Sequence, residues 1–190
     1  VVGLVSLLGI QRSAQPELDA RQILERTAKV YAECETYHDS GVVKTLFLQE
    51  RGKRTVIKPF TTAFVRPDRF RYEFKDRRGE EEFDRYLIWR KSQDVRTWWD
   101  VRPGVAEQSS LDRALSAARG VSGASSYTIP DLLLDLTAAF PRVTDLPNAE
   151  RKADADLDGA RCFTIHGGTL DEPMILWIDQ RTFLLRRIDE

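Results

Sequence analysis

The segment 69–75 constrains the fold of this chain more than any other part of its sequence. It reads Arg-Phe-Arg-Tyr-Glu-Phe-Lys, so three aromatic residues alternate with four charged ones. Because successive side chains of a β-strand point to opposite faces of a sheet, this alternation predicts a strand with one apolar and one solvated face. The apolar face needs a covering layer, which helices packed on the sheet would supply.

The rest of the sequence predicts further strands and three helices. A helical period over 19–34 indicates an amphipathic helix, and two shorter helices are expected at 110–119 and 130–140, the second with Pro130 at its start. The segment 174–178 is apolar at every position, which predicts a central strand covered on both faces. Other strands are expected at 42–48, 55–65, 83–89, 95–101, 160–165 and 183–188. The order helix, strands, helices, strands indicates an α+β fold with a curved antiparallel sheet of about eight strands.

Composition excludes several classes of function. The chain has 29 Lys+Arg and 30 Asp+Glu among 190 residues, so it lacks the basic excess of a nucleic-acid binder. Two Cys and two His provide little for metal chemistry, and we expect no metal site and no cofactor. Adjacent strand residues such as His38 and Asp39 point to opposite faces and do not form a catalytic pair. No nucleophile, base and orienting group converge, so no catalytic residue is predicted.

Residues 1–15 are expected to be the remnant of a signal peptide. The run 1–10 is apolar and too short to span a membrane, and small residues suited to cleavage follow it at 13–14. A buried first strand or an uncleaved anchor is the alternative. The sequence therefore predicts one exported domain over 16–190.

Several short motifs, taken in order, resemble the LolA-like carriers of outer-membrane lipoproteins. Arg66-Pro67-Asp68-Arg69-Phe70-Arg71-Tyr72 resembles the Arg-Pro strand of that superfamily, and Thr128-Ile129-Pro130-Asp131-Leu132-Leu133 resembles the start of its lid helix. Trp177-Ile178-Asp179, followed by 184–188, is similar to its last hairpin. The segments 96–100 and 120–126 have no counterpart in the family.

The resemblance implies a half-open β-barrel whose concave apolar face, with helices packed in and over it, shelters acyl chains. It also implies that Arg66 latches the lid by donating to its carbonyls, for which a guanidinium is suited. A plain surface arginine, and an ordinary core face instead of a ligand wall, are the alternatives. The candidates for lining the cavity are Phe64, Phe70, Tyr72, Phe74, Trp89, Trp99 and Leu133.

The two cysteines, Cys34 and Cys162, lie at the end of the first helix and in a late strand. In an exported protein such a pair suggests a disulfide that pins the helix to the sheet, with two separate buried thiols as the alternative.

Two functions are compatible with the sequence. The first is a monomeric, non-enzymatic carrier or binding protein, periplasmic or associated with the bacterial cell envelope, that shelters a lipid or the acyl chain of a lipoprotein. The second is an envelope domain that binds a protein partner or senses lipid without transporting it. One ring of the pair Trp98-Trp99 faces outward in a strand, and exposed aromatic rings of this kind favour the second function.

Overall fold

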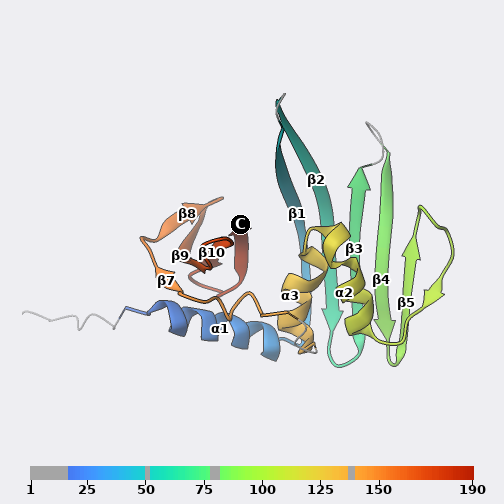
Figure 1. Ribbon diagram of the computed structural model, residues 1–190. Helices are drawn as coiled ribbons and strands as arrows, with labels where there is room; N and C mark the ends of the chain where they lie inside the picture. Colours follow the sequence, from blue (N-terminus) through green and yellow to red (C-terminus); the bar gives the residue numbers. More distant parts are fainter. Residues whose placement is uncertain (1–16, 50–51, 78–81, 137–139) are drawn as a thin grey trace, which may run out of the picture.

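The computed structural model describes residues 17–49, 52–77, 82–136 and 140–190. The predicted signal segment 1–15 lies outside these residues. The described part has an α+β fold with open antiparallel sheets, which confirms the predicted fold class (Figure 1). No helix in it is long and apolar enough to cross a membrane.

The larger sheet has six strands that follow one another in chain order. Each pairs antiparallel with the next, and Tyr72 lies opposite Thr62 on one side and Ile88 on the other. This register places the aromatic face of the segment 69–75 on the side of the sheet that carries two helices (Figure 1). The strands are β1 (Thr36–Gln49), β2 (Gly52–Val65), β3 (Arg69–Arg77), β4 (Phe83–Lys91), β5 (Asp94–Trp99) and β6 (Ala106–Glu107).

Two helices, α2 (Leu111–Ser122) and α3 (Ser125–Leu134), cover this face. The Ser110 side chain caps α2 by accepting from the Arg113 amide, and Gly123 ends it in the left-handed conformation that glycine tolerates best. The predicted helix at 130–140 is wrong in its start, because α3 begins five residues earlier and contains Pro130. Pro130 is buried, and tertiary packing there outweighs the local preference of proline for a helix start.

A second sheet is formed by the C-terminal part of the chain. Its order is β11-β10-β9-β7, with β8 paired to β9, and among the described residues no ladder joins it to the larger sheet. The expectation of one sheet is therefore corrected to two. Leu176 and Ile178 of β10 are fully buried while Trp177 is only partly so, which makes β10 central but completely covered on one face only. The strands are β7 (Glu150–Arg151), β8 (Ala155–Leu157), β9 (Ala160–Gly168), β10 (Pro173–Asp179) and β11 (Leu185–Asp189).

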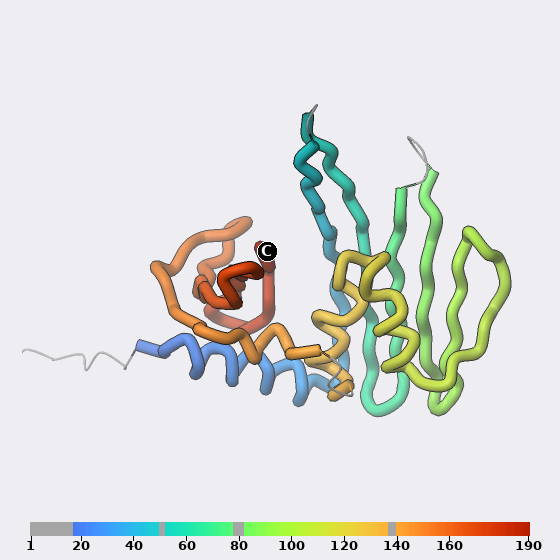
Figure 2. The backbone as a smooth tube through the Cα atoms, viewed as in Figure 1, coloured from blue at the N-terminus to red at the C-terminus, as the bar shows by residue number. Residues whose placement is uncertain are grey.

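The first helix, α1 (Ala20–Glu33), joins the two sheets (Figures 1 and 2). A capping box between Asp19 and Gln22 begins it. Ile23 and Leu24 pack in the core of the smaller sheet, whereas Tyr31, two turns further on, packs in the core of the larger one. The Tyr31 hydroxyl also accepts from the Leu185 amide of β11 at 3.1 Å. One amphipathic face of α1 thus contributes to both cores.

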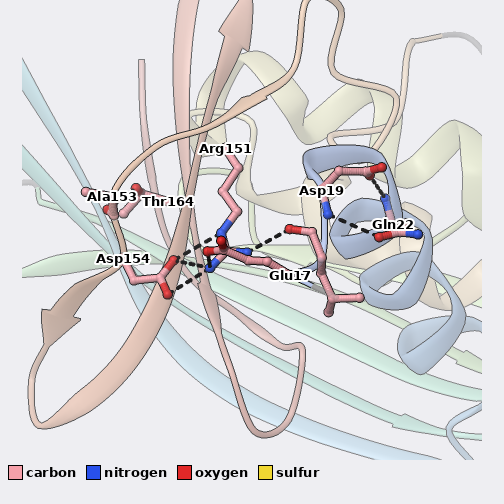
Figure 3. Close-up of polar contacts among 8 residues, drawn as sticks. Glu17, Asp19, Gln22, Arg151, Ala153, Asp154 and Thr164 are labelled. Atoms are coloured by element: carbon pink, nitrogen blue, oxygen red, sulfur yellow. Dashed lines mark hydrogen bonds and ion pairs between the residues drawn. The ribbon is translucent and has the colours of Figure 1, made fainter. Parts of the chain in front are cut away.

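An arginine of the smaller sheet fixes the start of α1 (Figure 3). Arg151 donates to the Leu18 carbonyl at 2.7 Å and forms ion pairs with Glu17 and Asp154 at 2.9 Å. The Arg151 and Asp154 side chains are both largely buried, so their ion pair is screened less than the pair with the exposed Glu17. The position of α1 on the smaller sheet is therefore set by polar as well as apolar contacts.

A buried carboxylate holds the turn between β10 and β11. Burial by itself would raise the pKa of Asp179, but hydrogen bonds from the Thr182 amide, the Arg186 guanidinium and the Arg181 amide lower that pKa to about 2. Because this pKa lies below that of the unfolded chain, the ionised carboxylate stabilises the folded state above about pH 4. That contribution is lost as the pH falls through about 2.

We expect Asp179→Asn to lower the free energy of unfolding by about 2 kcal/mol at pH 6, and by much less near pH 2. Urea unfolding at both pH values measures the difference. The control is Asp156→Asn. Asp156 lies in β8, is exposed and forms an ion pair with Arg161 of β9, so its replacement should have little effect on the free energy of unfolding at either pH. An equal loss for Asp179→Asn at both pH values would contradict this role of the carboxylate.

Candidate binding site

The aromatic face of β3 forms the floor of the candidate site. Phe70, Tyr72 and Phe74 are at most 3% exposed, and Phe64 of β2 lies in the same buried cluster. Aromatic rings continue this floor along neighbouring strands, since Phe74 stacks on Tyr86 with ring centroids 4.6 Å apart. The β3 alternation alone predicts this face, and the structure places it inside a continuous apolar core.

Residues of α2 and α3 cover this floor. Leu115 and Leu133 are at most 2% exposed and pack in the same cluster as the aromatic residues. One polar contact lies within the cover: the Tyr72 hydroxyl and the Ser125 hydroxyl are 2.7 Å apart, and Ser125 donates to the Ser122 carbonyl. Burial raises the pKa of Tyr72, so its hydroxyl is neutral and serves as a hydrogen-bonding group. Sequence reasoning missed this contact because no local pattern links 72 with 125.

Arg66 connects the cover to the rest of the protein. Its guanidinium donates to the Leu133 carbonyl of α3 at 3.3 Å, to the Ala32 carbonyl at 2.7 Å and to the Cys34 carbonyl at 3.1 Å. It also lies over the Phe64 ring, 5.0 Å from the centroid. Arg66 therefore has the bonding geometry that a latch on α3 requires, while its action as a latch stays a prediction.

The structure brings together most of the residues predicted to line a cavity. Phe64, Phe70, Tyr72, Phe74 and Leu133 belong to one buried cluster. Their side chains are packed against one another and against α2 and α3, so in this closed arrangement they form a core.

The two predicted tryptophans lie apart. Trp99 faces the helix side but lies at its margin and is 37% exposed. Its ring is tilted by 38° against that of Tyr86, with the ring centroids 4.2 Å apart. The prediction for Trp89 is corrected, because it lies opposite Arg71 and Arg96 on the face that the helices leave uncovered. The alternation along β4 places Ile88, not Trp89, beneath the helices.

Trp89 instead lines a shallow groove of about 570 Å³ on the uncovered face of the larger sheet. Leu87 and Ala63 contribute to its apolar lining, and Arg69 and Lys91 are exposed at its margin. A signal for this groove exists in the sequence. In the predicted strand 83–89, the side chains of Leu87 and Trp89 point to the face opposite that of Ile88, and both are apolar.

The predicted disulfide is not formed. Cys34 and Cys162 are free thiols, because Cys34 packs against the core of the larger sheet and Cys162 is buried in β9 of the smaller one. The Cys34 thiol donates to the Tyr31 carbonyl at 3.2 Å. Burial raises the pKa of both thiols, which keeps them protonated and poorly reactive.

The described residues contain no cluster of three or more His, Cys, Asp or Glu side chains that could hold a metal ion. Asp39, considered as a partner for His38, instead accepts from the Tyr37 hydroxyl at 2.9 Å and from the Thr62 amide at 3.0 Å. The arrangement at the aromatic face can therefore bind apolar groups, with Tyr72, Ser125 and Arg66 as its polar contacts.

No family model and no curated protein matches the sequence. Two solved structures are similar to this chain in fold. One is a DUF1329 family protein from Desulfovibrio piger, with 14% identity, a TM-score of 0.36 and coverage of 90% of this chain and 71% of that one. The other is a LolA superfamily protein from Nitrosomonas europaea, with 11% identity, a TM-score of 0.31 and the same coverage.

We expect Arg66→Leu to raise the rate of amide hydrogen exchange in α3 by at least about tenfold, because removing one net hydrogen bond to Leu133 and leaving buried carbonyls unpaired favours local opening. Amides of β9 and β10 should exchange as in the wild type. Arg69→Leu, which removes an exposed arginine three residues away, is the control. Unchanged protection of α3 in Arg66→Leu would show that Arg66 does not hold this helix.

A thiol count on denatured, unreduced protein should give two reactive thiols per chain. In the folded protein both should react more slowly than after denaturation, since burial and a raised pKa lower the thiolate fraction. A count of zero would mean that the two cysteines are bridged.

Proposed function

We propose that this protein is a non-enzymatic binding protein for long apolar ligands, such as the acyl chain of a lipid or of a lipoprotein. The ligand would lie on the aromatic face of β2 and β3, beneath α2 and α3. The observation that carries this proposal is the bond from Arg66 to the Leu133 carbonyl, which closes α3 over a fully buried aromatic floor. A helix closed over such a floor by few polar contacts is suited to act as a lid.

Ligand entry requires that α2 and α3 move, because their own side chains occupy the face in the closed state. The ligand would then replace the apolar contacts of residues such as Leu115 and Leu133. Burial of apolar surface contributes about 25 cal/mol per Å², so a chain of a dozen methylenes supplies several kcal/mol toward displacing the helices. Because the ligand replaces the apolar contacts that the helices lose, the net free-energy cost of displacing the helices is small.

Few polar contacts oppose this movement. Among the described residues they include the bond from Arg66 to Leu133, the contact between Tyr72 and Ser125, the bond from Lys58 to the Val121 carbonyl at 2.7 Å, and the ion pair of Arg142 with Asp131 of α3 at 3.5 Å. Each contributes about 1 kcal/mol net, so together they are comparable with the gain from an acyl chain. Gly123, with a φ of 62°, lies between the two helices and is the natural hinge.

In this proposal the protein works as a monomer in the bacterial periplasm or at the cell envelope, as its resemblance to LolA-like carriers implies. Its ligand is taken up and released by opening of the lid, and no chemical step is needed.

A second candidate function is binding of a protein partner in the envelope. The observation that favours it is the groove of about 570 Å³ on the uncovered face, with Trp89 in its lining and Arg69 and Lys91 at its margin. Amphipathic aromatic residues with adjacent cations are common in protein interfaces. In this case the aromatic face beneath α2 and α3 would remain a core.

Titration of delipidated protein with a fluorescent fatty-acid probe tests the first function. We expect saturable binding, displaced by unlabelled fatty acid, and an apparent Kd several-fold lower for Arg66→Leu because the open state is more populated. Arg69→Leu should bind as the wild type does. If neither the wild type nor Arg66→Leu binds the probe, and native mass spectrometry finds no lipid on the purified protein, the proposed function is wrong.

A further inference from the structure

The hairpin of β1 and β2 extends beyond the covered part of the larger sheet. The pairing of β2 with β3 ends where Phe60 lies opposite Phe74, yet β1 and β2 stay paired from there to Gln49 and Gly52. Figure 2 shows this two-stranded segment diverging from β3. We call the described residues 44–49 and 52–57 the arm.

The arm exposes large apolar side chains near its end. Leu46 is 51% exposed, Phe47 48% and Leu48 75%. Because they are consecutive in a strand, Leu46 and Leu48 lie on one face and Phe47 on the other. A strand on an ordinary sheet has at least one polar or covered face, whereas the end of this arm is apolar and exposed on both.

The charges of the arm have one sign. Lys44, Lys53 and Arg54 are exposed, and the described residues of the arm include no Asp or Glu. In the sequence, Glu50 and Arg51 between the two strands cancel in formal charge. The excess of positive charge is local, since the whole chain has a net charge of -1.

The register places cations beside the apolar side chains. Phe47 lies opposite Arg54 and Leu48 lies opposite Lys53, so each face of the arm carries an apolar group with a cation next to it. Long basic side chains can lay their methylenes along an apolar neighbour while the charged head reaches a phosphate. This is the combination of groups found in segments that bind the interface of a membrane.

We propose that the arm inserts its end into the surface of a lipid bilayer that contains anionic lipids. A protein partner would dock on one face of the hairpin, whereas a fluid interface surrounds it and so accommodates apolar groups on both faces. Pairing with a second copy through the edge strand β1 is opposed by the charge of Lys44 on that strand. The proposal does not rest on the proposed ligand site, since the arm lies beyond the part of the sheet that α2 and α3 cover.

Co-sedimentation with large unilamellar vesicles tests this surface. We expect the protein to bind vesicles of phosphatidylcholine with phosphatidylglycerol, and to bind pure phosphatidylcholine vesicles at least about tenfold more weakly. The double variant Phe47→Glu/Leu48→Glu should lose binding to both. Leu170→Glu is the matched control, because Leu170 is the most exposed large apolar residue in the described part of the chain and lies between β9 and β10, away from the arm. It should bind as the wild type does.

A second variant separates charge from apolar insertion. Lys53→Glu/Arg54→Glu keeps the exposed leucines and phenylalanine, and should weaken binding to anionic vesicles by about fivefold or more for each cation replaced. Added salt should weaken binding of the wild type more than binding of this variant. All these positions are exposed, so circular dichroism and thermal unfolding of both double variants should match the wild type.

Three results would overturn the proposal. The first is that the wild type binds neither kind of vesicle. The second is that either double variant, folded as the wild type is, binds anionic vesicles equally well. The third is that light scattering shows an oligomer of the wild type and a monomer of Phe47→Glu/Leu48→Glu, which would make the arm an interface between copies of the chain. Each can occur whether or not the fatty-acid probe binds, so the two proposals fail separately.

Discussion

The arrangement of this protein depends on how one guanidinium satisfies backbone carbonyls at the ends of two helices. The last carbonyls of a helix have no partner within it, and they carry the negative end of its dipole. Arg66 donates to Ala32 and Cys34 at the end of α1 and to Leu133 at the end of α3. Because Arg66 itself follows β2, hydrogen bonds from a single side chain connect both helix ends to the larger sheet. A lysine carries its donors on one nitrogen and lacks the planar fork of a guanidinium, so it would not reproduce the bonds that Arg66 makes from two separate nitrogens.

The helix α1 has a corresponding role between the two sheets. Its N-terminal half contributes Ile23 and Leu24 to one core, and its C-terminal end contributes Tyr31 to the other. The sheets share no ladder among the described residues, so helix packing and the bond from the Leu185 amide to the Tyr31 hydroxyl hold their positions. The two sheets are separate in the ribbon diagram, with α1 running beneath the smaller one toward the larger (Figure 1).

These features give the larger sheet regions with different properties. The part beneath α2 and α3 is dry and aromatic, and the polar bonds that close it are few. The arm is exposed, apolar and cationic. If the two proposals hold, one sheet would carry an apolar ligand at one end and contact the lipid surface at the other. The distance between them along β1 and β2 would let the lid open while the arm is bound.

The sequence by itself determined the local structure. The alternation at 69–75 identified the buried face of β3, and the helical period identified α1, because each depends only on the geometry of a strand or a helix. Tertiary structure alone decided which elements meet. It placed Trp89 on the uncovered face, separated Cys34 at the end of α1 from Cys162 in β9, began α3 before Pro130, and joined Tyr72 to Ser125. These outcomes depend on contacts between residues far apart in the chain, whose energies no local period records.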